Sequence, residues 1–166
     1  MRTNRTLATI LFVSALGAGL CSTNFVGAQS ALEGDTAKRF VGTWRLVSIT
    51  TDGKTDPNRG PNPTGLIQYD AKGYMAVQIM PDRVRPKYAS TQPTPDEAKA
   101  AITGYTAYFG TYTIDEKAHT VTHHRTGNIN PGGLGDFVRR YEFAPGDRLI
   151  LRPVENMNAL TWERIK

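Results

Sequence analysis

The sequence FVGTWRLVSIT, at residues 40–50, gives the first indication of the fold class. β-Branched and aromatic side chains dominate it, which is typical of a β-strand. The Asp52-Gly53 pair that follows favours a turn, so the strand ends there. Short apolar-rich runs broken by turn residues recur along the rest of the chain, and they predict an all-β domain.

Seven further runs of this kind follow the first, which gives eight strands. They lie at residues 64–70, 73–80, 105–114, 120–126, 137–143, 148–153 and 159–165. Short strands at even spacing within one domain indicate a sandwich or a closed barrel. Because most links between the runs are short, neighbours in sequence should pair with each other. We therefore expect an eight-stranded antiparallel up-and-down barrel.

One segment predicts a helix instead of a strand. Thr94 is a suitable N-cap, Pro95 suits the first helical position, and Glu97 completes a capping box. Alanines favour helix in the residues that follow, and Gly104 can end it. The short helix, residues 94–103, should lie between the third and fourth strands.

The first residues have the pattern of a secretory signal peptide. Arg2 and Arg5 give a positive start, and residues 7–20 are mostly apolar but short for a bilayer span. Small residues provide a cleavage site after Ala28. We expect residues 1–28 to be a cleaved signal peptide and the protein to be periplasmic or secreted. The alternative is an N-terminal anchor that is retained.

Cleavage after Ala28 would leave 166 − 28 = 138 residues, with 29–38 as a polar leader and 39–166 as the barrel domain. The only cysteine, Cys21, would leave with the signal, which excludes disulfides and thiol catalysis. The formal charge of +5 would fall to +3 (18 Lys and Arg against 15 Asp and Glu). This mild basic bias lacks a continuous basic run, so we expect no nucleic-acid partner and no stable membrane anchor after cleavage.

Two motifs resemble those of the calycin barrels, which include lipocalins and fatty-acid-binding proteins. Gly42-Thr43-Trp44 opens the first strand, and Trp162-Glu163-Arg164 lies late in the last. The resemblance implies that Trp44 plugs the closed end of the barrel and that Arg164 packs across it. A guanidinium over an indole face is favourable by about 1–2 kcal/mol when partly desolvated. Gly42, Trp44, Trp162 and Arg164 are therefore the expected barrel-closing residues.

The fuller pattern is similar to the bacterial and fungal lipocalin-like domain family. The matching motifs lie at residues 42–48, 65–75, 104–112, 121–124 and 139–143. The fatty-acid-binding subfamily does not fit, because residues 52–65 are too rich in proline and glycine to form its helical hairpin. The resemblance implies a barrel fold and says little about function, since one barrel hosts many activities.

The adjacent histidines His123 and His124 lie on a predicted strand. Side chains on a strand alternate between its faces, so the two rings point to opposite sides of the wall and cannot bind one metal ion. His119 shares a face with His123 but lies about 13 Å away along a strand. We therefore expect no metal site, with His124 facing solvent and His123 facing the interior.

The strand at residues 137–143 supplies the predicted inward charge. Its mostly aromatic face should point into the barrel and carries Phe137, Arg139, Tyr141 and Phe143. A hairpin that turns about Pro131 would set His123 opposite Arg139, whereas a slip of one residue would reverse the faces.

A charge inside the barrel needs a partner, because an unpaired buried ion costs several kcal/mol. For Arg139 the partner could be the carboxylate, enolate or phenolate of a ligand. The alternative is that Arg139 reaches solvent at the open end, or pairs with Glu163 or Asp136.

Two more strands supply polar groups to the predicted pocket. Tyr74 and Gln78 share one face of the third strand, and Tyr108 and Tyr112 share one face of the fourth. Hydroxyl and amide groups on an interior face would bind the polar part of a mainly apolar ligand. The expected ligand-binding residues are then Tyr74, Gln78, Tyr108, Tyr112, His123, Arg139 and Tyr141. The alternative is a packed core whose tyrosine hydroxyls reach the rim.

The expected function is the binding of a small hydrophobic ligand, which can be anionic, without a cofactor. No serine lies in a Gly-x-Ser-x-Gly motif and no phosphate-binding glycine loop is present, so binding is favoured over catalysis. One alternative is a cofactor-free isomerase or cyclase with His123 as acid or base, Tyr112 or Tyr108 as donor and Arg139 stabilising an oxyanion. The other is an envelope interaction protein whose barrel is packed solid.

Overall fold

The computed structural model describes residues 34–166. The two helices are α1 (Asp35–Phe40) and α2 (Pro95–Ile102). The strands are β1 (Gly42–Thr51), β2 (Lys54–Thr55), β3 (Thr64–Tyr69), β4 (Tyr74–Met80), β5 (Thr106–Asp115), β6 (Thr120–Asn128), β7 (Gly135–Ala144), β8 (Arg148–Pro153) and β9 (Asn158–Arg164). The predicted signal peptide, residues 1–28, lies outside the described residues, and α1 begins within the predicted leader.

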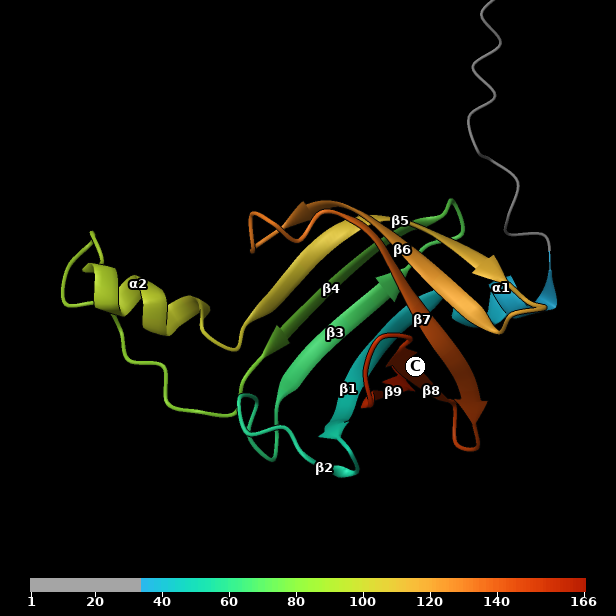
Figure 1. Cartoon of the computed structure of the whole chain (residues 1–166), viewed down its shortest axis with the longest axis horizontal. Coiled ribbons are helices and arrows are strands. Elements are labelled where there is room, and N and C mark those ends of the chain that lie inside the picture. The colour runs from blue at the N-terminus through green and yellow to red at the C-terminus, as the bar shows by residue number, and fades with distance from the viewer. Residues whose placement is uncertain (1–33) are drawn as a thin grey trace, which may run out of the picture.

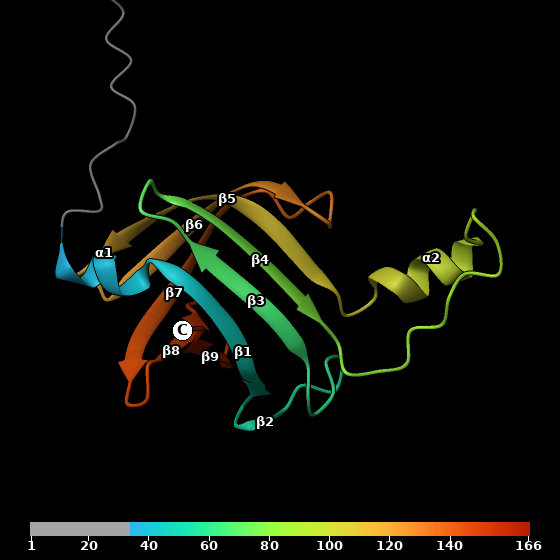
Figure 2. The same ribbon diagram turned by 180° about the vertical axis from the view of Figure 1, so that it is seen from behind.

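The long strands form a closed antiparallel barrel. Each of β3 to β8 pairs with the next strand, β1 pairs with β3, and the pairing of β1 with β9 closes the ring. Figures 1 and 2 show the strands from its two sides, with β1, β3 and β4 side by side in Figure 2. The predicted eight-stranded antiparallel barrel is therefore confirmed.

Two details of the predicted topology were wrong. The additional strand β2 pairs with the end of β1 through Thr50 and Thr55, and at two residues it is too short to show an alternating pattern. The short helix α2 consequently lies between β4 and β5, and not between the third and fourth strands. Its predicted capping box is present, with the Thr94 hydroxyl accepting from the Glu97 N–H at 3.3 Å.

One end of the barrel is sealed by α1 and by contacts around Trp44. The indole of Trp44 is buried, and its Nε1 donates to the Phe40 carbonyl at 2.8 Å. The guanidinium of Arg164 lies 4.1 Å from the Trp44 ring centroid, and its Nη1 donates to the Val41 carbonyl at 2.6 Å. This end therefore has the geometry that the calycin resemblance implies for Trp44 and Arg164.

Aromatic side chains fill the closed half of the barrel. The fully buried ring of Phe40 makes edge contacts with three other rings, at centroid distances of 5.1–5.2 Å. The partners are Tyr69, Tyr141 and Phe143. Because α1 carries Phe40 into the barrel, the helix acts as a plug whose removal would expose this aromatic cluster.

The opposite end of the barrel is open and carries the longer connections. One of them, residues 81–105, contains α2 and extends away from the barrel as an arm (Figure 1). None of the residues of α2 is buried. Within residues 34–166, neither helix has the length and apolar character needed to cross a membrane.

Candidate functional site

A buried histidine lies between two tyrosines inside the barrel. His123 has no exposed surface. Its Nε2 lies 2.7 Å from the hydroxyl of Tyr69 on β3, and its Nδ1 lies 2.9 Å from the hydroxyl of Tyr108 on β5. Both ring nitrogens are therefore hydrogen-bonded within the protein.

Arg139 extends this polar cluster and is only 6% exposed. Its Nη2 donates to the Tyr108 hydroxyl at 3.2 Å, and its guanidinium lies 4.3 Å from the ring centroid of Phe137. The other two nitrogens, Nε and Nη1, are buried and have no hydrogen-bond partner among the described residues. An arginine carries five N–H donors, so this side chain is far from satisfied.

The hydrogen bonds of the cluster form a chain in which each group donates to the next, from Arg139 through Tyr108 and His123 to Tyr69. Arg139 can only donate, so the Tyr108 oxygen accepts from it. The Tyr108 hydroxyl then donates to Nδ1 of His123, and the opposite nitrogen, Nε2, carries the hydrogen that is donated to Tyr69. In this assignment the hydroxyl hydrogen of Tyr69 remains available for a further acceptor.

Burial fixes the protonation states of these groups. Burial, and next the positive charge of Arg139, lower the pKa of His123 well below its usual value. Burial raises the pKa of Tyr69 well above its usual value. At neutral pH the imidazole of His123 and the phenol of Tyr69 are therefore both neutral.

The carboxylates considered as partners for Arg139 lie elsewhere. Asp136 contacts Nδ1 of His124 at 2.6 Å on the outer wall, and Glu163 pairs with Arg45 on the surface. None of the ion pairs among residues 34–166 includes Arg139. The alternative of a protein carboxylate neutralising Arg139 is thus not realised within this part of the chain.

The register of the β6–β7 hairpin differs from the prediction by two residues. His123 lies opposite Phe137, and Arg139 lies opposite Val121. The pairing is centred one residue before Pro131, and moving the centre by one residue shifts the partners by two. A two-residue shift preserves the faces, so His123 and Arg139 both point inward while His124 lies on the outer side.

The prediction that Tyr74 and Gln78 line the pocket was wrong. Tyr74 is 60% exposed and Gln78 is exposed, whereas the inward face of β4 carries Met75, Val77 and Ile79. Both faces of β4 include apolar residues, so alternation alone did not show which face is buried.

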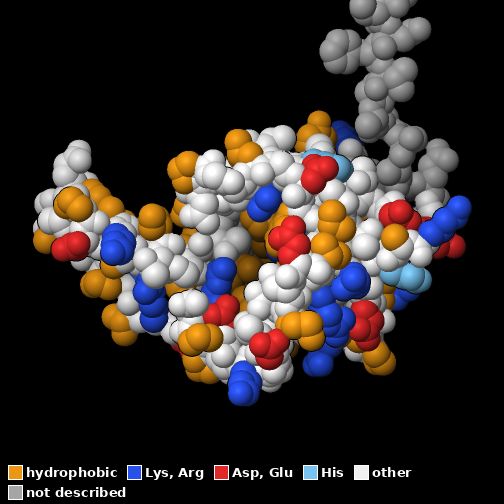
Figure 3. Space-filling view, in the orientation of Figure 1, with side chains coloured by type: hydrophobic (Ala, Val, Ile, Leu, Met, Phe, Trp, Pro, Cys, Tyr) orange, Lys and Arg blue, Asp and Glu red, His pale blue; other side chains and the backbone are white. Residues whose placement is uncertain are grey.

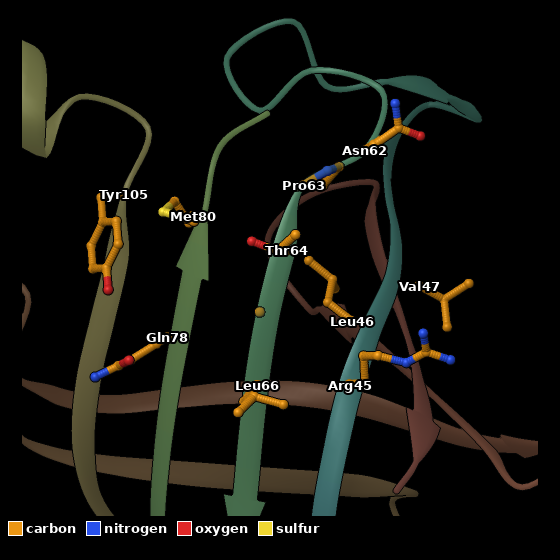
Figure 4. Close-up of a pocket in the computed structure, with 11 residues that line it drawn as sticks. Arg45, Leu46, Val47, Asn62, Pro63, Thr64, Leu66, Gln78, Met80 and Tyr105 are labelled. Atoms are coloured by element: carbon orange, nitrogen blue, oxygen red, sulfur yellow. The ribbon is translucent and has the colours of Figure 1, made fainter. Parts of the chain in front are cut away.

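Gln78 instead lines a groove of about 560 Å³ on the outer wall (Figure 4). The groove lies where β1 leaves β3, since the pairing of these strands ends at Arg45 and Leu66. Apolar side chains, including Val47, Leu66, Met80 and Tyr105, also line it. The residues of the His123 cluster do not take part in it.

Two other predicted ligand-binding tyrosines belong to the closed half of the barrel. The Tyr112 hydroxyl donates to the Asp70 carbonyl at 2.9 Å, and burial raises the pKa of Tyr112 to about 12. Tyr141 packs edge-on against Phe40. Of the two tyrosines predicted as the donor beside His123 and Arg139, Tyr108 contacts both residues. Tyr112 does not, because its hydroxyl is bonded at the β3–β4 turn.

Tyr69 was missed as a member of the cluster. It alternates with Ile67 on β3, and both are buried, so the alternation could have placed it on the inward face. Its contact with His123 crosses the barrel from β3 to β6, which do not pair. A sequence pattern along one strand contains no signal for such a contact.

The space-filling view shows where this interior meets solvent. Its surface is hollowed between the arm and β7, with hydrophobic side chains inside the hollow and both Lys or Arg and Asp or Glu side chains beside it (Figure 3). Among the described residues, no group of three or more His, Cys, Asp or Glu side chains is placed to hold a metal ion. The site is therefore described by its apolar wall and by the His123–Arg139 cluster.

A closed antiparallel barrel with one sealed end and an inward polar cluster defines a calycin-type barrel, an architecture suited to holding a small molecule. The profile of the lipocalin-like domain family matches residues 41–166, and the chain belongs to that family. No curated protein matches the chain.

Proposed function

We propose that the protein binds a small, mainly apolar molecule with an acidic head inside the barrel, and that the head sits on Arg139. The observation that carries this proposal is the pair of buried guanidinium nitrogens, Nε and Nη1, that have no partner among the described residues. The lipocalin-like fold supports the apolar part of the proposal, because the inner wall is made largely of buried hydrophobic side chains.

The chemistry of the head follows from electrostatics. A buried charge without a counter-ion is costly, so an anion that enters the barrel gains more from Arg139 than it would from a charge in water. A carboxylate matches the planar guanidinium with two hydrogen bonds. The Tyr69 hydroxyl, whose own pKa is raised by burial, is a neutral donor on the same cluster.

The state of His123 favours binding over acid–base catalysis. Tyrosine hydroxyls occupy both ring nitrogens, so a ligand does not meet a free imidazole nitrogen. A general base must lie within hydrogen-bond reach of the proton it removes. An isomerase or cyclase activity would therefore have to act through a tyrosine hydroxyl of the cluster.

We also propose that the chain is exported and that the barrel works outside the cytoplasm. The support is the signal-like sequence before Ala28. Amino-terminal sequencing of protein recovered from the producing cell should give Gln29 as the first residue. An intact N-terminus at Met1 would contradict the cleavage.

Binding can be tested with dodecanoate and its uncharged ester, methyl dodecanoate. Titration calorimetry should show dodecanoate binding at least about tenfold more tightly, since one charge-assisted hydrogen bond contributes roughly 1.5–3 kcal/mol. R139M should lose this preference. R140M is the matched control, because Arg140 is the neighbouring arginine and is exposed on the outer face. Equal binding of acid and ester by the wild-type protein would contradict the proposal.

Native mass spectrometry of protein from the producing cell distinguishes the remaining alternatives. A co-purified acidic apolar compound supports binding. Failure to bind either probe, with nothing co-purified, indicates a barrel that is packed solid. Conversion of a bound compound into an isomer indicates the enzymatic alternative.

A further inference from the structure

A second arginine lies between the polar cluster and the open end of the barrel. Arg125, near the end of β6, is anchored by hydrogen bonds from its Nε to the Gly135 carbonyl at 3.1 Å and from its Nη2 to the Leu134 carbonyl at 3.4 Å. Its guanidinium lies 4.9 Å from the ring centroid of Phe137. The guanidinium of Arg139 lies 4.3 Å from the same centroid. One phenyl ring therefore contacts both cations.

The order of these residues along β7 places Phe137 nearer to the open end than Arg139. β7 begins at Gly135, beside the open end, and Phe137 and Arg139 follow on the same face. Arg139 is buried, whereas Phe137 and Arg125 are only half-buried. A molecule that enters from the open end meets Arg125 and Phe137 before it meets Arg139.

The two unpartnered nitrogens of Arg139 have essentially no exposed surface. A ligand reaches them only when a neighbouring side chain moves. Tyr108 is hydrogen-bonded to both His123 and Arg139, so moving it breaks two bonds. Phe137 has no polar group to lose and is only half-buried, so it gives up its cation–π contacts and part of its apolar packing but no hydrogen bond. Phe137 is therefore the side chain that can turn aside most easily.

We propose that Arg125 is an entry site for the carboxylate of the ligand and that the ring of Phe137 is the gate between Arg125 and Arg139. This inference rests on the proposed function, since it assumes an acidic ligand that ends on Arg139. No ion pair among residues 34–166 occupies Arg125, so its charge is available to an incoming anion. Movement of the carboxylate from Arg125 to Arg139 exchanges one cation for another and leaves no step with an unpaired anion.

Stopped-flow binding of cis-parinaric acid, a fluorescent carboxylic acid, separates the two roles. R125M should slow association about fivefold at low salt, because electrostatic steering acts mainly on the association rate. The difference should vanish near about 0.5 M NaCl, where charges are screened. F137A should speed both association and dissociation by about fivefold or more, as expected when a barrier common to both directions is removed.

Matched controls come from the outer surface. F109A removes an exposed ring that lies opposite Gly127, and R152M removes an exposed arginine, so neither should change the rates. F137L is the second gate variant. It keeps an apolar side chain and should give an intermediate effect if the alanine variant does not fold.

The outcomes distinguish this inference from the proposed function. If R139M weakens binding but R125M, F137A and F137L keep rates within about twofold of the wild type, the gate is wrong and the proposed function stands. If the wild-type protein does not bind cis-parinaric acid, or if R139M binds it as the wild type does, both are overturned. A rate change in R125M that persists at high salt overturns the entry-site role of Arg125.

Discussion

Replacement of Arg139 by methionine should cost the ligand-free protein little or no stability. The substitution removes a buried guanidinium whose Nε and Nη1 have no partner among the described residues. Exchanging buried ionic groups for apolar side chains of similar volume is neutral or stabilising by about 1–4 kcal/mol. Against this, the variant loses one hydrogen bond to Tyr108, about 1 kcal/mol, and the cation–π contact with Phe137, about 1 kcal/mol. Tyr108 keeps its bond to His123, so no new unsatisfied hydroxyl is created.

A gain of about 1–4 kcal/mol less two losses of about 1 kcal/mol each leaves a net change of about −1 to +2 kcal/mol in the free energy of unfolding, so Tm should rise by at most roughly 8 °C. Urea and thermal unfolding of protein stripped of bound lipid measure it. R140M, on the outer face, should stay within about 0.5 kcal/mol of the wild type. If the free energy of unfolding of folded R139M is lower than that of the wild type by more than about 1 kcal/mol, the Arg139 guanidinium has stabilising partners without a ligand, and the reasoning fails.

Three further predictions concern the closed end and the buried histidine. Gly42→Ala should lower the free energy of unfolding in urea by about 1–3 kcal/mol, because φ is +139° and the new Cβ would lie 2.6 Å from a guanidinium nitrogen of Arg164. Gly132→Ala is the control, because there is open space around Gly132. Equal losses of stability in the two variants would contradict the closed-end geometry. Phe40→Ala should cost about 3–5 kcal/mol by the same assay, and a loss below about 1 kcal/mol would show that α1 is not a plug. Burial lowers the pKa of His123, so at mildly acidic pH the unfolded chain binds a proton that the folded chain does not. The free energy of unfolding should therefore fall as the pH drops below about 6.5, by up to about 1.4 kcal/mol per pH unit. His123→Gln should flatten the dependence of the unfolding free energy on pH between about pH 7.5 and 5.5, whereas His119→Gln should keep it. Identical pH dependences in the wild type and in His123→Gln would refute the attribution of this effect to His123.

The barrel could be predicted from the sequence because its strands show clear alternation and its turns carry glycine, proline and aspartate. The inward faces of β6 and β7 were also readable, since polar and aromatic residues separate there. The pairing register of β6 and β7 could not be predicted, because it depends on where the turn lies within residues 129–134. A turn centred on Pro131 places the centre of the hairpin one residue too late. The inward and outward faces were nevertheless predicted correctly, because a register shift of two residues leaves each side chain on the same face of the sheet.

The rest of the site depends on contacts that cross the barrel. β4 carries apolar side chains on both faces, so Tyr74 and Gln78 could not be assigned to the outside from their own strand. Tyr69 reaches His123 from a strand that does not pair with β6, and no local pattern encodes that distance. A two-residue strand such as β2 is likewise too short for periodicity to reveal.

The most direct test of an anion on Arg139 is the nitrogen–proton NMR signal of its Nε–H group during titration with dodecanoate. Comparison with the spectrum of R139M assigns this signal. We predict that it shifts and saturates with the same apparent Kd as the backbone signals of the barrel wall, and that dodecanol leaves it in place. Backbone signals that shift on binding while the Arg139 Nε–H signal stays unchanged would contradict the proposal.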